Sequence, residues 1–227
     1  MIPSTANEKT LTCSGLLFDN DGVLIDASAA IEYCWRTFAE HYNLPADEVV
    51  AQVPGRRSQD VINRYAQMLP VTVDEALRHY EQLCVEDNTA VEALPGAIEL
   101  LESIPRTCWT VVTSGTRDLT TTRLRAAGLP IPPVLVTAED VSAGKPDPAP
   151  YRLAAERLGL PSESCLAIED APPGLTSARK AGCRTLALLT THDATELTGA
   201  DMYALNLSHV RTIFGTTSLQ VVVSYSG

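Results

Sequence analysis

Four short polar segments of this chain combine carboxylates, hydroxyl groups and one ammonium group. Carboxylates can act as nucleophiles or as acid–base groups, and a site built from oxygen donors suits Mg²⁺. Hydroxyl and ammonium groups beside them would suit the binding of an anion. Three of the segments follow apolar runs, and one precedes a predicted helix. They are Asp19-Asn20-Asp21-Gly22, Thr113-Ser114-Gly115, Gly144-Lys145-Pro146 and Glu169-Asp170.

Each segment by itself also has an ordinary structural interpretation. An Asp-x-Asp-Gly stretch often forms a turn, Thr-Ser-Gly often caps a helix, and Gly-Lys-Pro is typical of a solvated loop. An acidic pair before a helix can simply favour the helix N-terminus. The occurrence of all four in order, each beside the end of a predicted strand or helix, favours a functional site.

The apolar runs of the chain predict the elements that would position these segments. The runs are short and continuous, which is typical of parallel strands buried on both faces. Amphipathic stretches at 117–127, 148–158 and 173–181 alternate with them, and a glycine follows each stretch. This alternation predicts an α/β fold with a doubly wound, mostly parallel, Rossmann-like sheet, in which ligands bind beyond the carboxyl ends of the strands. The predicted strands are Leu16–Phe18, Cys108–Val112, Val134–Val136, Leu166–Ile168 and Leu186–Leu189.

One long region interrupts the alternation. Residues 27–94 show helical periodicity and no strand-like run, and they are too many for a simple crossover between parallel strands. We expect them to form an all-helical cap, inserted into an α/β catalytic core made of residues 1–26 and 95–227. Residues 1 to about 12 are polar and aperiodic, which predicts a frayed terminus.

Composition limits the classes of partner. The chain has 227 residues and a formal net charge of −11, so neither nucleic acid nor an anionic membrane surface is an expected partner. The six cysteines are too far apart for a zinc cluster, and several lie in apolar runs, where reduced thiols pack. No apolar run is long enough to span a membrane. We expect a cytoplasmic protein that acts on a small molecule, as a monomer.

The four segments resemble the four motifs of the haloacid dehalogenase-like phosphatase superfamily, specifically of members with a small helical cap after the first motif. The resemblance spans residues 14–205. Three longer stretches are similar to the small sugar and polyol phosphatases, which include the glycerol-phosphate and 2-deoxyglucose-6-phosphate phosphatases. These stretches are Thr113–Asp118, Gly144–Tyr151, and Glu169–Gly174 together with Ala181–Cys183.

The resemblance implies a phosphatase for small sugar or polyol phosphates, with Mg²⁺ as cofactor and a small phosphorylated metabolite as substrate. Asp19 would be the nucleophile that forms an aspartyl-phosphate. Asp21 would protonate the leaving alkoxide and then activate water. The implied Mg²⁺ ligands are the Asp19 carboxylate, the Asp21 main-chain carbonyl and Asp170, with Glu169 behind them.

The resemblance also implies residues that bind the phosphate and the rest of the substrate. Lys145 would offset the negative charge of the nucleophile and of the phosphoryl oxygens. The Thr113 hydroxyl would hold a phosphoryl oxygen together with backbone N–H groups at Ser114 and Gly115. Three arginines are candidates for substrate contact, and each is equally consistent with a surface position. They are Arg56 and Arg57, in a cap loop after Pro54-Gly55, and Arg117, just past the second motif.

Three other reactions occur in relatives that share these motifs. Dehalogenases lack the second carboxylate because a halide leaves without a proton, so Asp21 argues against dehalogenation. Phosphonoacetaldehyde hydrolases use a lysine of the cap, whereas the lysines here are Lys9, Lys145 and Lys180, none of them in the cap. β-Phosphoglucomutases carry a histidine in the first cap helix where this chain has Ile31. Phosphoryl transfer of the mutase kind stays an alternative to hydrolysis.

A catalytically silent binding protein is the alternative from a different class. Such a family member is expected to have lost one of the charged motif residues, and all of them are present. Asn20 stands between the two aspartates, where the family usually has an apolar or aromatic residue. On an extended segment its side chain would point away from the two carboxylates, so we expect little effect on the chemistry.

Overall fold

The core is a six-stranded parallel sheet in the order β6-β5-β2-β7-β8-β9. The computed structural model describes residues 7–53, 56–86, 91–215 and 218–225. Strand β2 pairs with β5 on one side and with β7 on the other, as in a doubly wound sheet, whose ligands bind where the strand order reverses. The strands are β2 (Gly15–Phe18), β5 (Trp109–Val112), β6 (Leu135–Val136), β7 (Cys165–Glu169), β8 (Arg184–Leu188) and β9 (Met202–Ala204).

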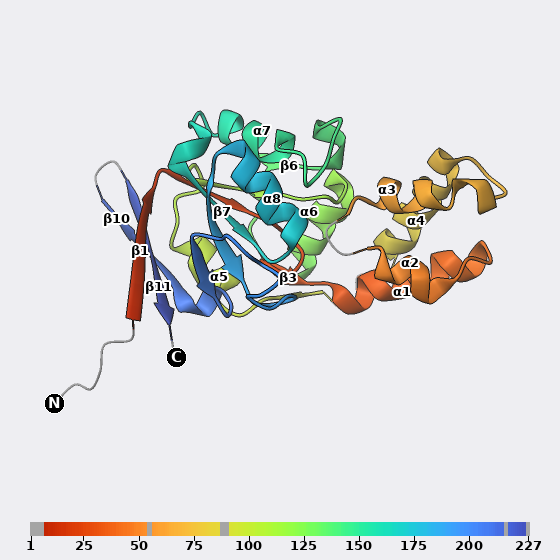
Figure 1. Ribbon diagram of the computed structural model, residues 1–227, viewed down its shortest axis with the longest axis horizontal. Helices are drawn as coiled ribbons and strands as arrows, with labels where there is room; N and C mark the ends of the chain where they lie inside the picture. Colours follow the sequence, from red (N-terminus) through yellow and green to blue (C-terminus); the bar gives the residue numbers. More distant parts are fainter. Residues whose placement is uncertain (1–6, 54–55, 87–90, 216–217, 226–227) are drawn as a thin grey trace.

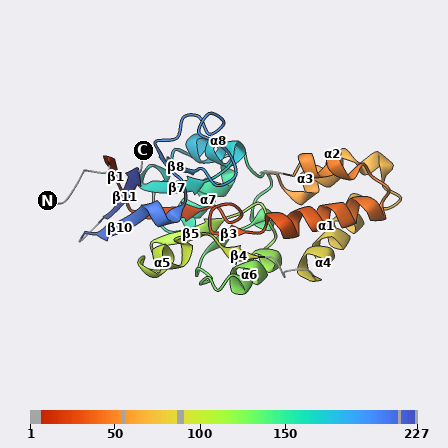
Figure 2. The same cartoon turned by 90° about the horizontal axis from the view of Figure 1, so that it is seen from below.

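Helices cover both faces of this sheet, which explains why its strands are apolar throughout. Leu16 and Phe18 pack with α5 and α6, whereas Leu17 packs with α7 and α8. Figure 2 shows α5 and α6 on one side of the strands and α8 on the other. No helix in the described part of the chain is long and apolar enough to cross a membrane. The core helices are α5 (Ala97–Glu102), α6 (Arg117–Ala126), α7 (Ala149–Arg157) and α8 (Pro172–Ala181), with 3₁₀ turns η2 (Ala138–Asp140), η3 (Ser162–Ser164) and η4 (Leu207–His209).

A two-stranded antiparallel ribbon connects the core to the cap. It pairs Ile25 with Ala93 and Asp26 with Glu92. The four α-helices between its strands lie at one end of the molecule (Figure 1). The predicted helical cap is confirmed, but the expectation of no strand within 27–94 is wrong, because two of these residues form β4. The elements are β3 (Ile25–Asp26), α1 (Ser28–His41), α2 (Ala46–Ala51), α3 (Ser58–Arg64), η1 (Ala66–Met68), α4 (Val73–Glu86) and β4 (Glu92–Ala93).

The cap has an apolar core of its own. Trp35 stacks on Tyr80 with ring centroids 4.0 Å apart, and Phe38 meets both rings edge-on. All three side chains are buried, and they hold α1 against α4. Leu119 of core helix α6 packs into the same cluster. The cap and the core therefore share an apolar contact along α6.

The N-terminal segment forms a strand, so the predicted frayed terminus is wrong for its described residues. Strand β1 pairs antiparallel with β11, and β11 pairs with β10, in a sheet at the end opposite the cap (Figure 1). Leu11 and Cys13 are buried in the core with Val221 and Val223. The sequence provides little indication of β1, because two apolar side chains in a polar stretch are a weak pattern for a strand. Its partner strand also lies at the other end of the chain. The strands are β1 (Asn7–Cys13), β10 (Val210–Phe214) and β11 (Leu219–Tyr225).

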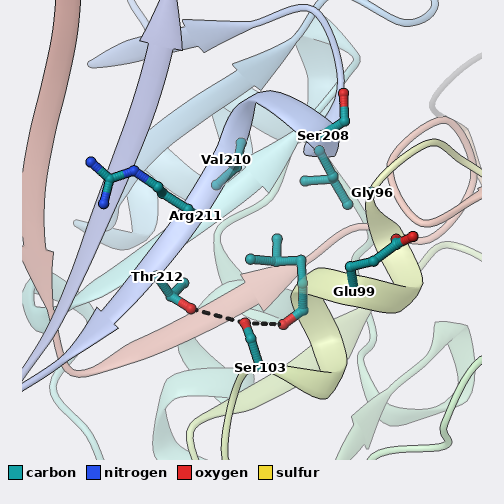
Figure 3. Close-up of a pocket in the computed structure, with 9 residues that line it drawn as sticks. Gly96, Glu99, Ser103, Ser208, Val210, Arg211 and Thr212 are labelled. Carbon is teal, nitrogen blue, oxygen red and sulfur yellow. Dashed lines mark hydrogen bonds between the residues drawn. The ribbon is translucent and has the colours of Figure 1, made fainter.

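Helix α5 packs closely against the segment before β10. A cavity of about 430 Å³ opens along this contact. The hydroxyl groups of Ser103 and Thr212, which line it, are 3.0 Å apart, and Figure 3 shows the hydrogen bond between them. None of the site residues predicted from the sequence lines this cavity. Gly96 lies at its edge with a φ of +86°, and a Cβ atom there would be 2.2 Å from the backbone nitrogen of Ser208. Gly96 is thus required both by its left-handed conformation and by the close approach of a second backbone segment.

We expect Gly96→Ala to lower the free energy of unfolding by about 2–5 kcal/mol, because it adds steric overlap to a strained φ. Gly128→Ala is the matched control, since Gly128 also has a positive φ but no atom lies within 4 Å of its missing Cβ. The control should cost about 1–2 kcal/mol. Chemical denaturation measures both variants. Equal losses would contradict the close packing of α5.

Candidate active site

A cavity of about 490 Å³ lies between the carboxyl ends of the central strands and the cap. One wall comes from the segments after β2, β5 and β7, and the opposite wall from α1, α4 and the residues around Val53. Parallel strands place their carboxyl ends at one edge of a sheet, so motifs that are far apart in the sequence meet here. The sequence-predicted site residues that line the cavity are Asp19, Asp21, Arg56, Thr113, Ser114, Gly115, Lys145, Glu169 and Asp170.

Asp19 and Asp21 stand directly after β2. The Asp19 N–H donates to the Ile168 carbonyl of β7 at 3.0 Å, which fixes Asp19 beside the neighbouring strand. The main chain then turns, and the Asn20 carbonyl accepts hydrogen bonds from the N–H groups of residues 23–25. The Asp19 side chain is 15% exposed and that of Asp21 is 34% exposed. Both carboxylates reach the cavity, and Asp19 is the more deeply buried.

Asn20 contacts the site, so the orientation expected for its side chain is wrong. Its Nδ2 donates to Oδ2 of Asp21 at 3.3 Å, and the residue is buried. The expectation assumed an extended segment, whereas β2 ends at Phe18 and the chain turns at once. Asn20 therefore restrains the second aspartate.

Lys145 links the first motif to the fourth. Its Nζ lies 2.8 Å from Oδ1 of Asp19 and 2.7 Å from Oε1 of Glu169. Tyr151 of α7 donates its hydroxyl to the same Glu169 oxygen. Burial by itself lowers the pKa of Lys145, but the two carboxylates outweigh this effect and raise the pKa. The amine therefore stays charged between two buried acids.

Asp19, Glu169 and Asp170 form a cluster that fits a divalent cation. One carboxylate oxygen from each lies within 4.8 Å of the others. Among the described residues, Oδ1 of Asp170 and Oε2 of Glu169 are buried without a hydrogen-bond partner. The cluster holds three carboxylates, and the ammonium group of Lys145 pairs with two of them, so the cluster has an excess of negative charge. Oxygen donors in a negative site are those that Mg²⁺ prefers.

The pKa shifts of these carboxyls have the same cause. Burial raises the pKa of Asp19 and the charge of Glu169 adds to this rise, while Lys145 opposes it, with a result of about 7. Burial also raises the pKa of Asp170, and the charge of Asp19 adds to the effect, again to about 7. Without a cation, protons would occupy the cluster near neutral pH.

The loop after β8 holds Asp170 in place. The Thr191 hydroxyl donates to Oδ2 of Asp170, and the Thr190 hydroxyl donates to the Gly22 carbonyl. Gly22 has a φ of +81°, and a Cβ atom there would lie 2.1 Å from Oδ2 of Asp170. A glycine is therefore needed in the first motif so that its turn can pass the fourth.

Thr113 ends up at the cavity because it directly follows β5. Its Oγ1 accepts the Gly115 N–H at 3.0 Å, which folds the short turn. A hydroxyl group can accept one hydrogen bond and donate another, so the Thr113 hydroxyl can still donate to an anion. Ser114 and Gly115 line the same cavity. The structure brings the three residues together, and their binding of phosphate stays a prediction.

Arg56 is the candidate arginine that lines the cavity. Its guanidinium donates to the side chain and the carbonyl of Gln52 in the same part of the cap. The side chain is otherwise exposed, so it can reach a bound molecule. Pro54 and Gly55, which precede Arg56 in the expected cap loop, lie outside the described residues.

Arg57 and Arg117 are not among the residues that line the cavity. Arg57 pairs with Asp60 at 3.0 Å and donates to the Ser142 carbonyl of a core loop. Arg117 pairs with Asp140 at 2.8 Å. The structure thus uses Arg57 as a contact between cap and core, and Arg117 in an ion pair on the core.

Three residues that sequence reasoning left without a role contact the motifs. Tyr151 and Thr191 hold Glu169 and Asp170, as described above, and Arg123 pairs with Asp21 at 3.1 Å. The sequence indicates only which face of its helix Arg123 shares, and not its contact with Asp21. Arg123 follows Leu119 by four positions, which places both on one face of the helix after the second motif.

The model of a family described as haloacid dehalogenase-like hydrolase matches residues 16–188. The match covers most of the chain and includes all four motifs. The chain belongs to the haloacid dehalogenase-like hydrolase family. The resemblance predicted from the motifs is thereby confirmed.

Similar proteins within this family are named as phosphatases. Hexitol phosphatase A of Escherichia coli is 34% identical over 203 residues, covering 88% of this chain and 94% of the relative. Glycerol-1-phosphate phosphohydrolase 2 of Saccharomyces cerevisiae is 31% identical over 221 residues, covering 91% of this chain and 88% of the relative. Among solved structures, a hydrolase from Pseudomonas syringae matches with a TM-score of 0.75 and 29% identity, covering 86% of this chain and 94% of that chain.

The carboxylate cluster predicts how stability depends on pH when no divalent cation is bound. The carboxyls of Asp19 and Asp170 have pKa values of about 4 in an unfolded chain and about 7 in the fold. Between these values the folded state holds protons that the unfolded state lacks. In excess chelator the free energy of unfolding should therefore fall as the pH rises from about 5 to about 8. Saturating Mg²⁺ should reverse this loss, because the cation replaces the protons.

Chemical denaturation in chelator at several pH values measures this slope. Asp170→Asn is the matched variant, because it removes a carboxyl with a raised pKa and should make the slope shallower. A free energy of unfolding that rises with pH over the same range in chelator would show that the cluster is not arranged as described.

Proposed function

We propose that this protein is a Mg²⁺-dependent phosphatase that hydrolyses small sugar or polyol phosphate monoesters through an aspartyl-phosphate on Asp19. The observation that carries the proposal is the pair of carboxylates after β2. Asp19 is ion-paired with Lys145 at 2.8 Å, and Asp21 stands beside it, more exposed to the cavity. Transfer of a phosphoryl group to water in two steps needs a nucleophile and an acid–base group close together. The names of the two relatives support this class of substrate.

The two carboxylates divide the reaction between them. In the first step, an oxygen of Asp19 forms a bond to phosphorus while the bond from phosphorus to the ester oxygen breaks, and the leaving alkoxide takes a proton from Asp21. In the second step, Asp21 takes a proton from water while the water oxygen attacks phosphorus, and the bond from phosphorus to Asp19 breaks. Inorganic phosphate is released and Asp21 is protonated again, so the cycle closes.

Positive charge must hold the phosphoryl group, because a carboxylate attacks an anion. The Lys145 ammonium group would contact the phosphoryl oxygens, and the Thr113 hydroxyl would donate to another of them. Mg²⁺ would supply further charge neutralisation when bound. Its proposed ligands are Asp19, Asp170 and the main-chain carbonyl of Asp21, with Glu169 behind them.

The cap would contact the other end of the substrate. Ile31, Trp35 and Tyr80 line the cavity on that side, and Arg56 adds a positive charge. A cavity of about 490 Å³ suits a small metabolite. Such walls would bind a short polyol chain less specifically than the motifs bind phosphate. We therefore expect the protein to hydrolyse several small phosphate esters.

The nature of residue 31 favours hydrolysis over transfer to a second sugar hydroxyl. Ile31 lines the cavity, and its side chain neither donates nor accepts a hydrogen bond. It therefore cannot make the action of Asp21 depend on a bound sugar, and water can reach the phosphorylated Asp19.

Three features predicted from the sequence stay predictions. We propose residues 27–94 as the cap, because α1 to α4 lie between the two strands of the ribbon. The monomeric state and the cytoplasmic location are the other two. The net charge of −11 continues to favour a small molecule, and neither nucleic acid nor an anionic membrane, as partner.

Asp19→Asn should lower turnover of a hexitol phosphate or glycerol 1-phosphate by more than about a thousandfold, because the amide cannot form the covalent intermediate. Release of inorganic phosphate in Mg²⁺ measures this loss. Asp74→Asn, at an exposed position of α4, is the control and should keep full activity. If the Asp19 variant retained a tenth or more of the activity, an aspartyl-phosphate at this position would be ruled out.

The products distinguish hydrolysis from mutase chemistry. Incubation with glucose 1-phosphate, glycerol 1-phosphate and hexitol phosphates should release inorganic phosphate without a bisphosphate activator. The reason is that Ile31 does not keep water away from the phosphorylated Asp19. Both free phosphate and isomerised sugar phosphate are followed. Isomerised product in the absence of free phosphate would establish the mutase alternative instead.

A further inference from the structure

Arg123 is a buried charge at the cavity that the chemistry proposed above leaves without a role. It lies on core helix α6 and is 4% exposed. Its Nη1 is 3.1 Å from Oδ1 of Asp21, the acid–base residue of the proposed reaction. Removing a guanidinium group from water is energetically unfavourable unless good partners replace the water. The position of Arg123 therefore calls for a reason beyond packing.

Within the described residues, the rest of the guanidinium group has no compensating hydrogen bond. Nε and Nη2 of Arg123 are buried without a hydrogen-bond partner in the described part of the chain. Buried donors without partners destabilise a fold, and stable proteins contain few of them. The ion pair with Asp21 is thus the interaction that keeps Arg123 in place, and stability alone does not explain it.

The surroundings of Arg123 fix its side chain against the cap. Leu119, one helical turn earlier, packs into the apolar cluster of the cap. Tyr80 of α4 lines the same cavity as Arg123, and the positive charge of Arg123 opposes the rise that burial causes in the pKa of Tyr80. A side chain held between α6 and the cap has little freedom to turn away from Asp21.

The two oxygens of Asp21 are held differently. Oδ1 accepts from the charged Arg123 at 3.1 Å, and Oδ2 accepts from Asn20 at the longer distance of 3.3 Å. A guanidinium group only donates, so it favours the oxygen that carries no proton. This arrangement leaves Oδ2 to carry the proton that the leaving alkoxide takes.

We propose that Arg123 is a positioning residue that fixes the Asp21 carboxyl, with Asn20, in the orientation that protonates the leaving oxygen. This inference rests on the proposed function of the site. Because Arg123 belongs to the core, the orientation of Asp21 is set before a substrate binds. The acid–base group then needs no contact from residue 31 of the cap, where this chain has Ile31.

Two substrates with different leaving groups test this role. An alkoxide needs a proton as it leaves, whereas p-nitrophenolate is a stable anion and leaves without one. Arg123→Met should lower kcat/KM for glycerol 1-phosphate and a hexitol phosphate by at least about a hundredfold, and for p-nitrophenyl phosphate by less than about fivefold. kcat/KM is the appropriate quantity because it reports the steps up to departure of the leaving group.

Three further variants complete the design. Asp21→Asn should show the same selective loss, and the Asp21→Asn, Arg123→Met double variant should lose little more, because the two residues act as one unit. Arg123→Lys keeps a buried positive charge, so it should fold even if Arg123→Met does not, and should show a smaller loss with the same selectivity. Arg125→Met, at an exposed position on the same helix, is the control and should leave both substrates unaffected.

The outcomes separate this inference from the function on which it rests. Equal losses for the alkyl and aryl esters in the folded Arg123 variants would overturn the positioning role, because damage to structure or phosphate binding affects both substrates alike. Independent, additive losses in the double variant would overturn it as well. If the unmodified protein released phosphate from none of the three esters, the proposed function would fail, whatever Arg123 does.

Discussion

The structure depends on keeping several buried carboxylates together beside one lysine. Strand β2 pairs in parallel with β7, so that Phe18 lies opposite Ile168 and the acids after each strand emerge side by side. Lys145 bridges Asp19 and Glu169 from the loop before α7. Like charges held this closely repel each other, and the surrounding fold must resist that repulsion. The apolar strands and the helices on both faces provide the rigid frame.

The same constraint explains several local features around the cluster. Tyr151 and the threonines after β8 donate to the acidic residues or to the turn beside them, which stabilises negative charge with neutral donors. The glycine that closes the first motif lets two acidic segments approach closely. Several of the buried polar atoms that have no hydrogen-bond partner among the described residues lie at this edge of the sheet, as is common where a fold is built for chemistry rather than for stability alone.

The sequence was most informative where local patterns and long-range partners agree. Strands β2, β5, β6, β7 and β8 and helices α6 to α8 are predictable, because continuous apolar runs, amphipathic stretches and terminal glycines indicate the same elements, whereas β9 is not among the predicted strands. Strand β1 is not predictable, because Leu11 and Cys13 indicate a buried strand only once its pairing with β11, at the far end of the chain, is known. The motif residues are predictable from their types and order. The contacts of Arg123 and Asn20 with Asp21 are not, because they depend on a turn and a helix orientation that no local pattern specifies.

The ribbon of β3 and β4 places the two ends of the cap next to each other. Neighbouring strands lie about 5 Å apart, so the inserted helices leave and re-enter the core at almost the same point. An insertion with adjoining ends can be lengthened, shortened or exchanged for another without moving β2, β5 or β7. The cap side of the cavity can therefore change by replacement of a whole module, while the carboxylates and Lys145 at the strand ends keep their positions.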